Sequence, residues 1–205
     1  MRKLFKRIKT RVKKKTVEIP VNLVIENKKI SLRALCSGLG INVPKEFEKT
    51  ADEKNSLAFR SKYVKPGDIC LIIRSAEDFQ SASMTTKDQY NIAIKKGAKL
   101  IIMGKKAFKK AHLKKRKFPV ILMNESDKRI AGFIERIREK QKGKVVMVTG
   151  SLGKTTTKDF CYAITKGSFR TFAARQNSNT THRVVQHLFE QADKEYDVYI
   201  QEAGA

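Results

Sequence analysis

Two periodicities of hydrophobic residues alternate along most of this chain. Short apolar runs such as residues 69–73 and 144–149 are typical of buried strands. Between these runs, apolar residues recur every three or four positions, which is typical of helices with one buried face. The clearest helical stripe consists of Ile130, Phe133, Ile134 and Ile137. Strands that alternate with helices favour an α/β fold, and beyond residue 143 they favour a parallel sheet with helices on both faces.

The predicted elements form two groups, separated by the polar stretch 139–143. In the first group, alternating residues 16–25 predict a strand, and Ser31 caps a short helix that ends near Gly38. Further strands are expected at 57–61, 69–73, 99–103 and 119–123, and helices at 86–96, where Gly97 supplies a left-handed cap, at 105–117 and from 126. The second group comprises strand 144–149, helix 154–166, strand 169–173, helix 181–192 and strand 197–201.

The chain is strongly basic, and its basic residues include a distinct segment at the N-terminus. The chain has 45 Lys and Arg against 20 Asp and Glu, a formal charge of +25, which points toward polyanions or a membrane surface, or reflects a compositional habit of the source organism. Residues 1–15 carry apolar side chains at positions 4, 5, 8 and 12, a helical spacing on an otherwise basic segment. This segment could lie on anionic lipid or RNA, or extend into solvent.

Two features bear on the cellular compartment of the protein: its apolar segments and its cysteines. No apolar run approaches the roughly 18 residues that a membrane span needs, and the basic start is not followed by the apolar core of a secretory signal. Cys36, Cys70 and Cys161 are odd in number and widely spaced, so we predict buried thiols in a reducing compartment. We therefore expect a cytoplasmic protein.

The stretch 149–158, with the sequence TGSLGKTTTK, carries the most specific chemistry. It joins a hydrophobic strand to a helix N-terminus, where backbone N–H groups and the helix dipole favour phosphate. Gly150 and Gly153 let the main chain approach phosphate oxygens, Lys154 reaches the terminal phosphates, and Thr155 offers a hydroxyl to Mg²⁺. The predicted nucleotide-binding residues of this turn are Gly150, Ser151, Gly153, Lys154, Thr155 and Thr156.

The turn is a variant of the usual phosphate-binding loop. The strict Walker A spacing places a glycine six residues before the lysine, and this chain has Val148 there. A plain turn between a strand and a helix is the alternative. The order of strand, glycine turn, lysine, hydroxyl and helix favours nucleotide binding.

At this point the sequence resembles the Mur ligases, in particular the branch that adds D-alanyl-D-alanine. Residues 149–158 are similar to that family's offset ATP-binding loop, and residues 59–68 to the signature of its N-terminal domain. Residues 90–103 resemble the helix and strand that follow that signature. Downstream, 176–181 resembles its asparagine-rich loop and 200–205 its acidic motif at a strand end. The similarity covers roughly residues 55–205.

The residue pattern and the resemblance together predict three regions, and the resemblance implies a reaction. The regions are the basic segment 1–15, a small N-terminal α/β substrate-type domain over 16–142, and over 143–205 the first part of a P-loop parallel-sheet ATPase domain. The resemblance implies an ATP-dependent amide ligase of peptidoglycan synthesis, which activates a carboxylate as an acyl phosphate for attack by an amine. The implied substrates are ATP, a UDP-linked muramyl peptide, and a dipeptide or amino acid.

Individual roles also follow from the resemblance. Lys154 would stabilise the transferring phosphoryl group, and Thr155 with Glu202 would hold Mg²⁺. Asn177 and Asn179 would lie near the phosphates or the metal. Glu202 could instead be an ordinary surface acid, although the carboxyl ends of parallel strands are where such sheets bind ligands.

The chain departs from the family in two respects. After the asparagines the family continues toward Ile-Gly-x-Pro, whereas this chain has residues 182–185, HRVV. His182 and His187 are five residues apart, so they do not share a helical face and we expect solvated or partly packed side chains. The second departure is length, because the remaining central sheet, a modified lysine near the metals and a third domain have no counterpart. We therefore expect a truncated form with an exposed sheet edge.

Two other function classes remain open. The charge of +25 and the basic runs at 2–15 and 105–117 suit a nucleic-acid-binding protein, although no RNA or DNA motif is present and aromatic residues make up only 8%. Another P-loop nucleotide-binding protein, such as a kinase, would need a second acidic motif and a lid that the sequence does not reveal.

Overall fold

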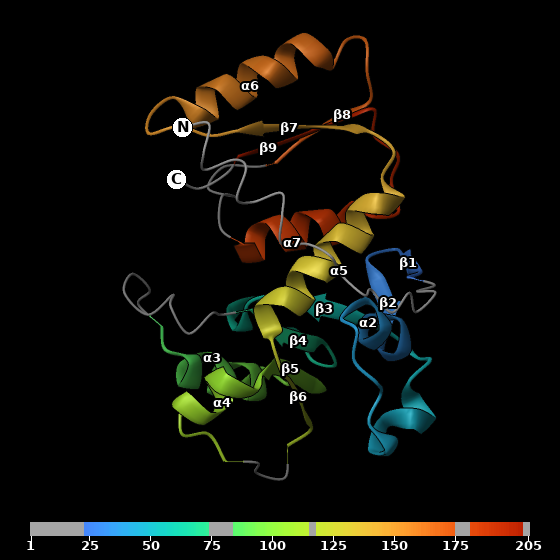
Figure 1. The fold of residues 1–205 in the computed structure, drawn as a ribbon, viewed down its shortest axis with the longest axis vertical. Coiled ribbons are helices and arrows are strands. Elements are labelled where there is room, and N and C mark those ends of the chain that lie inside the picture. The colour runs from blue at the N-terminus through green and yellow to red at the C-terminus, as the bar shows by residue number, and fades with distance from the viewer. Residues whose placement is uncertain (1–22, 74–83, 115–117, 175–180, 203–205) are drawn as a thin grey trace, which may run out of the picture.

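The computed structural model describes residues 23–73, 84–114, 118–174 and 181–202, and at residues 181 and 182 only the main chain (Figure 1). It is an α/β protein with two sheets, as the sequence predicts. The first sheet has the order β1-β2-β3-β4-β5-β6 and the second the order β7-β9-β8. The predicted segment 1–15 and most of the predicted strand 16–25 lie outside the described residues.

The first sheet begins with an antiparallel hairpin and continues with parallel strands. Its strands are β1 (Ile25–Glu26), β2 (Lys29–Ser31), β3 (Lys54–Ala58), β4 (Ile69–Ile72), β5 (Leu100–Gly104) and β6 (Val120–Met123). Strands β1, β2 and β3 pair antiparallel, whereas β3 to β6 pair parallel. The intervening elements are α2 (Leu32–Gly38), two 3₁₀ helices, η1 (Lys45–Thr50) and η2 (Ser61–Tyr63), α3 (Thr86–Lys95), α4 (Lys105–Lys110) and the long α5 (Ser126–Lys140).

Two helix starts in this half are fixed by side-chain caps. Ser31 Oγ accepts a hydrogen bond from the Ala34 N–H, which confirms the predicted cap of α2. At α3, Thr85 and Asp88 form a reciprocal capping box. Gly97, after α3, has φ +81°, the left-handed conformation that the sequence predicts there.

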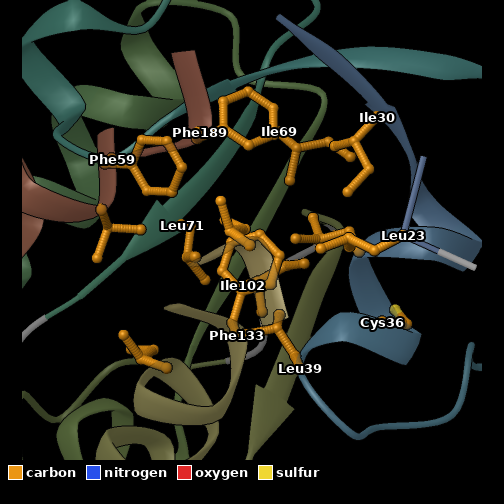
Figure 2. Packing of buried hydrophobic residues seen from close by; sticks show 14 of the residues in the cluster. Leu23, Ile30, Cys36, Leu39, Phe59, Ile69, Leu71, Ile102, Phe133 and Phe189 are labelled. Atoms are coloured by element: carbon orange, nitrogen blue, oxygen red, sulfur yellow. The ribbon is translucent and has the colours of Figure 1, made fainter. Parts of the chain in front are cut away.

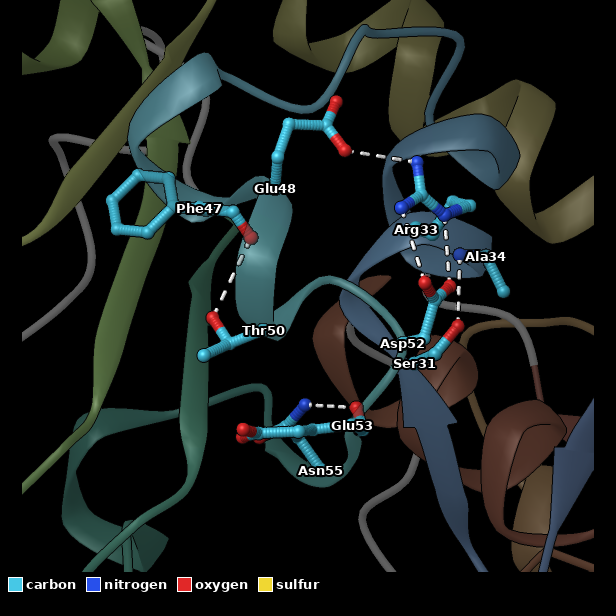
Figure 3. Close-up of polar contacts among 9 residues, drawn as sticks. All are labelled: Ser31, Arg33, Ala34, Phe47, Glu48, Thr50, Asp52, Glu53 and Asn55. Carbon is cyan, nitrogen blue, oxygen red and sulfur yellow. Dashed lines mark hydrogen bonds and ion pairs between the residues drawn. The ribbon is translucent and has the colours of Figure 1, made fainter.

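An ion-pair cluster ties α2 to the segment before β3 (Figure 3). The Arg33 guanidinium donates to both Asp52 oxygens, at 2.8 and 3.1 Å, and lies 3.1 Å from Glu48. The Arg33 N–H also donates to the carbonyl of Ala51. These contacts hold the segment before β3 against α2. Because the side chains are exposed, they contribute only modestly to the free energy of folding.

The main hydrophobic core lies between the first sheet and helices α2 and α5, and it includes α7 (Figure 2). Phe133 of α5 is fully buried, and its ring packs so closely on Gly38 that any side chain at that position would clash. Val185, Leu188 and Phe189 of α7 (Thr181–Glu190) join the same cluster. The two predicted domains therefore share one core.

The second sheet is small and parallel. It consists of β7 (Lys144–Val148), β8 (Thr171–Ala173) and β9 (Val198–Glu202), with α6 (Lys154–Thr165) after β7. Figure 1 shows α6 on the outer side of this sheet and α7 on its inner side. In the described part, β7 pairs with β9 alone, and Val145, Val146 and Met147 are exposed at this edge, which confirms the expected open edge.

Four local predictions need correction. The predicted strand 57–61 begins and ends earlier, because the polar residues 54–56 pair with β2 and Ser61 enters η2. The predicted helix 105–117 stops at Lys110, since His112 takes φ +50°. The predicted strand 169–173 is limited to β8, because the Phe169 N–H donates to the Thr165 carbonyl in the turn after α6 and the Arg170 N–H donates to the Asp197 carboxylate. Cys36 and Cys70 are buried as predicted, but Cys161 is only half-buried.

No helix in the described ranges has both the length and the apolar character needed to cross a membrane. The longest of them, α5, carries charged residues throughout.

Candidate nucleotide-binding site

The glycine-rich turn lies at the carboxyl end of β7 and leads directly into α6. Gly150 has φ +145° and Gly153 has φ +72°, both in regions that residues with a Cβ avoid. Gly153 is the N-cap residue of α6, so the first turn of the helix opens toward the loop. The N–H groups of that turn have no acceptor within the helix and are available to an anion.

Lys154 folds back over this loop. Its Nζ donates a hydrogen bond to the Gly150 carbonyl at 2.6 Å, so the half-buried side chain spans the turn that the glycines form. Leu152, by contrast, is 93% exposed at the tip. The ammonium is therefore held beside the helix N-terminus, where a phosphate oxygen could replace the carbonyl as its acceptor.

Glu202 ends β9 beside the start of the same loop. The strand register places Glu202 opposite Val148, the last residue of β7. The Glu202 side chain is almost fully buried, and its Oε1 accepts no hydrogen bond of acceptable geometry. The carboxylate that the sequence nominates as a metal ligand is therefore not an ordinary surface acid.

Lys158, one turn into α6, lies at this site, and the sequence reasoning gave it no role. It is 2% exposed, and its Nζ lies 3.3 Å from Glu202 Oε1 and 3.4 Å from Asp159 Oδ1. Two signals pointed to it: Lys158 lies four residues after Lys154, on the same face of a helix, and that face is the one turned to the sheet. The partner could not be found from this spacing, because Glu202 is 44 positions away.

The predicted site residues are partly brought together. Glu202 contacts Lys158, three positions after Thr155 on α6. Asn177 and Asn179 lie outside the described residues, so their placement stays a prediction. The predicted residues that share the loop and the first turn of α6 are Gly150, Ser151, Gly153, Lys154, Thr155 and Thr156.

The donor set suits a hard divalent cation that is shared with phosphates. A buried carboxylate oxygen without a hydrogen bond and a threonine hydroxyl are oxygen ligands of the kind that Mg²⁺ prefers. Within the described ranges, no group of three or more His, Cys, Asp or Glu side chains is positioned to hold a metal by itself. The residues therefore fit a cation to which a nucleotide supplies further ligands.

Of His182 and His187, the side chain of His187 is described, and it packs against aromatic residues. His187 is buried, and its ring lies edge-on to Phe172, with the ring centroids 6.0 Å apart. Phe172 in turn stacks on Tyr199 of β9 at 4.9 Å. This cluster joins α7 to the inner face of the second sheet.

Comparisons with known proteins find relatives that match the region of this loop. Residues 148–205 match the model of the Mur ligase middle domain. The UDP-N-acetylmuramoyl-tripeptide–D-alanyl-D-alanine ligase of Rickettsia prowazekii is 31% identical over 146 residues, which are 71% of this chain and 30% of that protein.

Two solved structures have the same fold. The MurF ligase of Thermotoga maritima in complex with ADP has a TM-score of 0.54 at 24% identity, over 74% of this chain and 32% of its own. MurF of Acinetobacter baumannii has a TM-score of 0.64 at 17% identity, over 88% of this chain and 36% of its own. The chain thus spans about a third of the length of these relatives. Over that part the chain is similar to Mur ligases, and its residues 148–205 match their middle domain.

Proposed function

We propose that this chain carries the phosphate-binding part of an ATP-dependent amide ligase of peptidoglycan synthesis. The observation that supports this most strongly is the convergence of Lys154, the N-terminus of α6 and the buried Glu202 at the carboxyl ends of β7 and β9. Ligands of open parallel sheets bind at this end of the strands. The matched middle-domain model covers this same region.

In the proposed reaction, the chain's residues bind and orient the triphosphate. The N–H groups of the loop and of the first turn of α6 donate to phosphate oxygens, and Lys154 exchanges the Gly150 carbonyl for a terminal phosphate. Glu202 and the Thr155 hydroxyl would hold Mg²⁺, which supplies charge neutralisation on the transferring phosphoryl group. Ser151 and Thr156 lie on the same turn and would complete the cradle.

The acid and amine substrates are proposed from the printed name of the Rickettsia relative. They are a UDP-linked muramyl tripeptide, which would become the acyl phosphate, and D-alanyl-D-alanine, whose amine would displace the phosphate. The first sheet would belong to the part that receives the UDP-linked substrate. We also propose a division into 16–142 and 143–205, because the polar stretch 139–143 lies just after α5 and before the first strand of the second sheet.

The decisive experiment measures binding of a fluorescent ADP analogue to Lys154→Met in the presence of Mg²⁺. A hydrogen bond to a charged group contributes about 1.5–3 kcal/mol, so we expect the affinity to fall by roughly 10- to 100-fold. Lys166→Met is the matched control, because Lys166 is exposed at the far end of the same helix and should leave binding unchanged.

A nucleic-acid-binding function is the competing candidate, favoured by the charge of +25. Retention of a single-stranded RNA, measured over a series of salt concentrations on the same variants, discriminates the two. RNA affinity with a steep salt dependence and no ADP binding would reverse the assignment.

A further inference from the structure

Lys158 and Glu202 form a buried ion pair at the proposed phosphate site. The side chains are 3% and 4% exposed, and Nζ lies 3.3 Å from Oε1. Removing two charges from water is costly unless each compensates the other. Each of these groups therefore depends on its partner for its place in the interior.

The second carboxylate near Lys158 is a weaker partner. Asp159 Oδ1 lies 3.4 Å from the ammonium, but the Asp159 side chain is 64% exposed, so water screens its charge. Glu202 is consequently the principal counter-ion of Lys158.

The position of the pair links it to metal binding. Thr155 and Lys158 are three residues apart on α6, so their side chains emerge from neighbouring turns on one face. A cation held by Thr155 and Glu202 would thus lie beside the Lys158 ammonium and use the same carboxylate. Two cations on one carboxylate repel each other, and the repulsion is strong where water is excluded.

We propose that Lys158 is the resident counter-ion of Glu202 and that a divalent cation must share or displace it, so that Lys158 sets the metal affinity of the nucleotide site. The inference rests on the proposed function. It concerns a residue for which the proposed mechanism had no role. An ammonium on Glu202 keeps the carboxylate compensated before metal and nucleotide arrive, and it raises the metal concentration needed for binding.

The test is a titration of Mg²⁺ at a fixed concentration of the fluorescent ADP analogue, with the intact chain. In Lys158→Met, Glu202 loses its competing cation, and we expect the Mg²⁺ midpoint to fall about tenfold. In Lys158→Arg, the guanidinium can grip the carboxylate through two donors, and we expect the midpoint to rise several-fold. A cavity of about 560 Å³ beside Lys158 offers room for the larger group. Lys166→Met is again the control.

A direct readout uses Mn²⁺ in place of Mg²⁺ and counts free metal by electron paramagnetic resonance. Lys158→Met should bind Mn²⁺ with ADP more tightly than the wild type, and adding Glu202→Gln should abolish that gain. A purely structural role for Lys158 would lower the melting temperature but leave the midpoints unchanged, which would overturn the inference. A higher midpoint in Lys158→Met would overturn it as well.

The outcomes separate this inference from the proposed function. If the wild type binds no ADP at any Mg²⁺ concentration, the proposed function fails and this inference fails with it. If the wild type binds ADP and the variants share its midpoint, only the role of Lys158 fails. Should Lys158→Met not fold, Lys158→Arg decides the question, since an unchanged or lower midpoint there contradicts the competition.

Discussion

Truncation of Phe189 tests whether α7 holds the second sheet against the first sheet. Phe189 is 2% exposed, and its ring meets that of Phe59 edge-on, with the centroids 5.6 Å apart. A buried Phe→Ala change costs about 3–5 kcal/mol, and the edge-to-face pair accounts for roughly 0.5–1.5 kcal/mol of such a loss. The cavity left by the Phe189 ring would lie between the two sheets, so movement of a single neighbouring side chain cannot fill it. We therefore expect a loss of stability in the upper part of the 3–5 kcal/mol range, about 4 kcal/mol or more.

Urea unfolding followed by far-ultraviolet circular dichroism measures the effect, since the chain has no tryptophan. With a denaturant slope of about 2 kcal/mol/M, a loss of about 4 kcal/mol lowers the midpoint by roughly 2 M. Phe160→Ala on the outer face of α6 is the control, because that ring is 65% exposed and its loss should change stability by less than about 0.5 kcal/mol. A loss below about 1 kcal/mol in Phe189→Ala would refute the shared core.

Thiol reactivity and acid stability give two further predictions. Burial raises the pKa of Cys36 and that of Cys70 to about 12. At pH 8, iodoacetamide should therefore label the half-buried Cys161 first, as followed by peptide mass spectrometry. Equal labelling of the three cysteines would contradict this prediction. Hydrogen bonds from the Arg170 guanidinium lower the pKa of Asp197 in the folded protein. The ion pair therefore stabilises the fold at pH values above about 3.9, the pKa of Asp in the unfolded chain, and this stabilisation is lost as the pH falls through the lower pKa of the folded state. Arg170→Met should flatten the acid limb of a thermal-denaturation series below about pH 4, and superimposable curves would argue against it.

The elements with strong local signals could be predicted from the sequence. β4 and β5 are continuous apolar runs, and the α5 stripe buries Ile130, Phe133 and Ile137 as expected. β3 was misplaced because its first residues, 54–56, are polar and become a strand only by pairing with β2. Such pairing joins distant segments, and the local hydrophobic pattern carries no trace of it.

The site divides in the same way. The loop could be recognised because its chemistry is local: two glycines with positive φ, a lysine and a helix start occupy five consecutive positions. The contact between Lys158 and Glu202 could not be predicted. It depends on the strand register that places Val148 opposite Glu202 and on the packing of α6 against β9. The spacing from Lys154 indicates that Lys158 lies on the sheet-facing side of α6, but no neighbouring residue indicates the carboxylate beside which it is only 2% exposed.

The anchoring of the second sheet explains why the loop should depend on α7. At the β7 edge Met147 is 58% exposed, and the outer face of α6 leaves Ile164 in solvent, so neither surface is packed in the described part of the chain. What holds the loop is the pairing of β7 with β9, and β9 in turn is held by Tyr199, whose ring lies in the core cluster that α7 enters. Loosening α7 therefore loosens β9 and with it Glu202. On this reasoning Phe189→Ala should weaken ADP binding as well as stability, although Phe189 belongs to a core cluster that contains no residue of the loop.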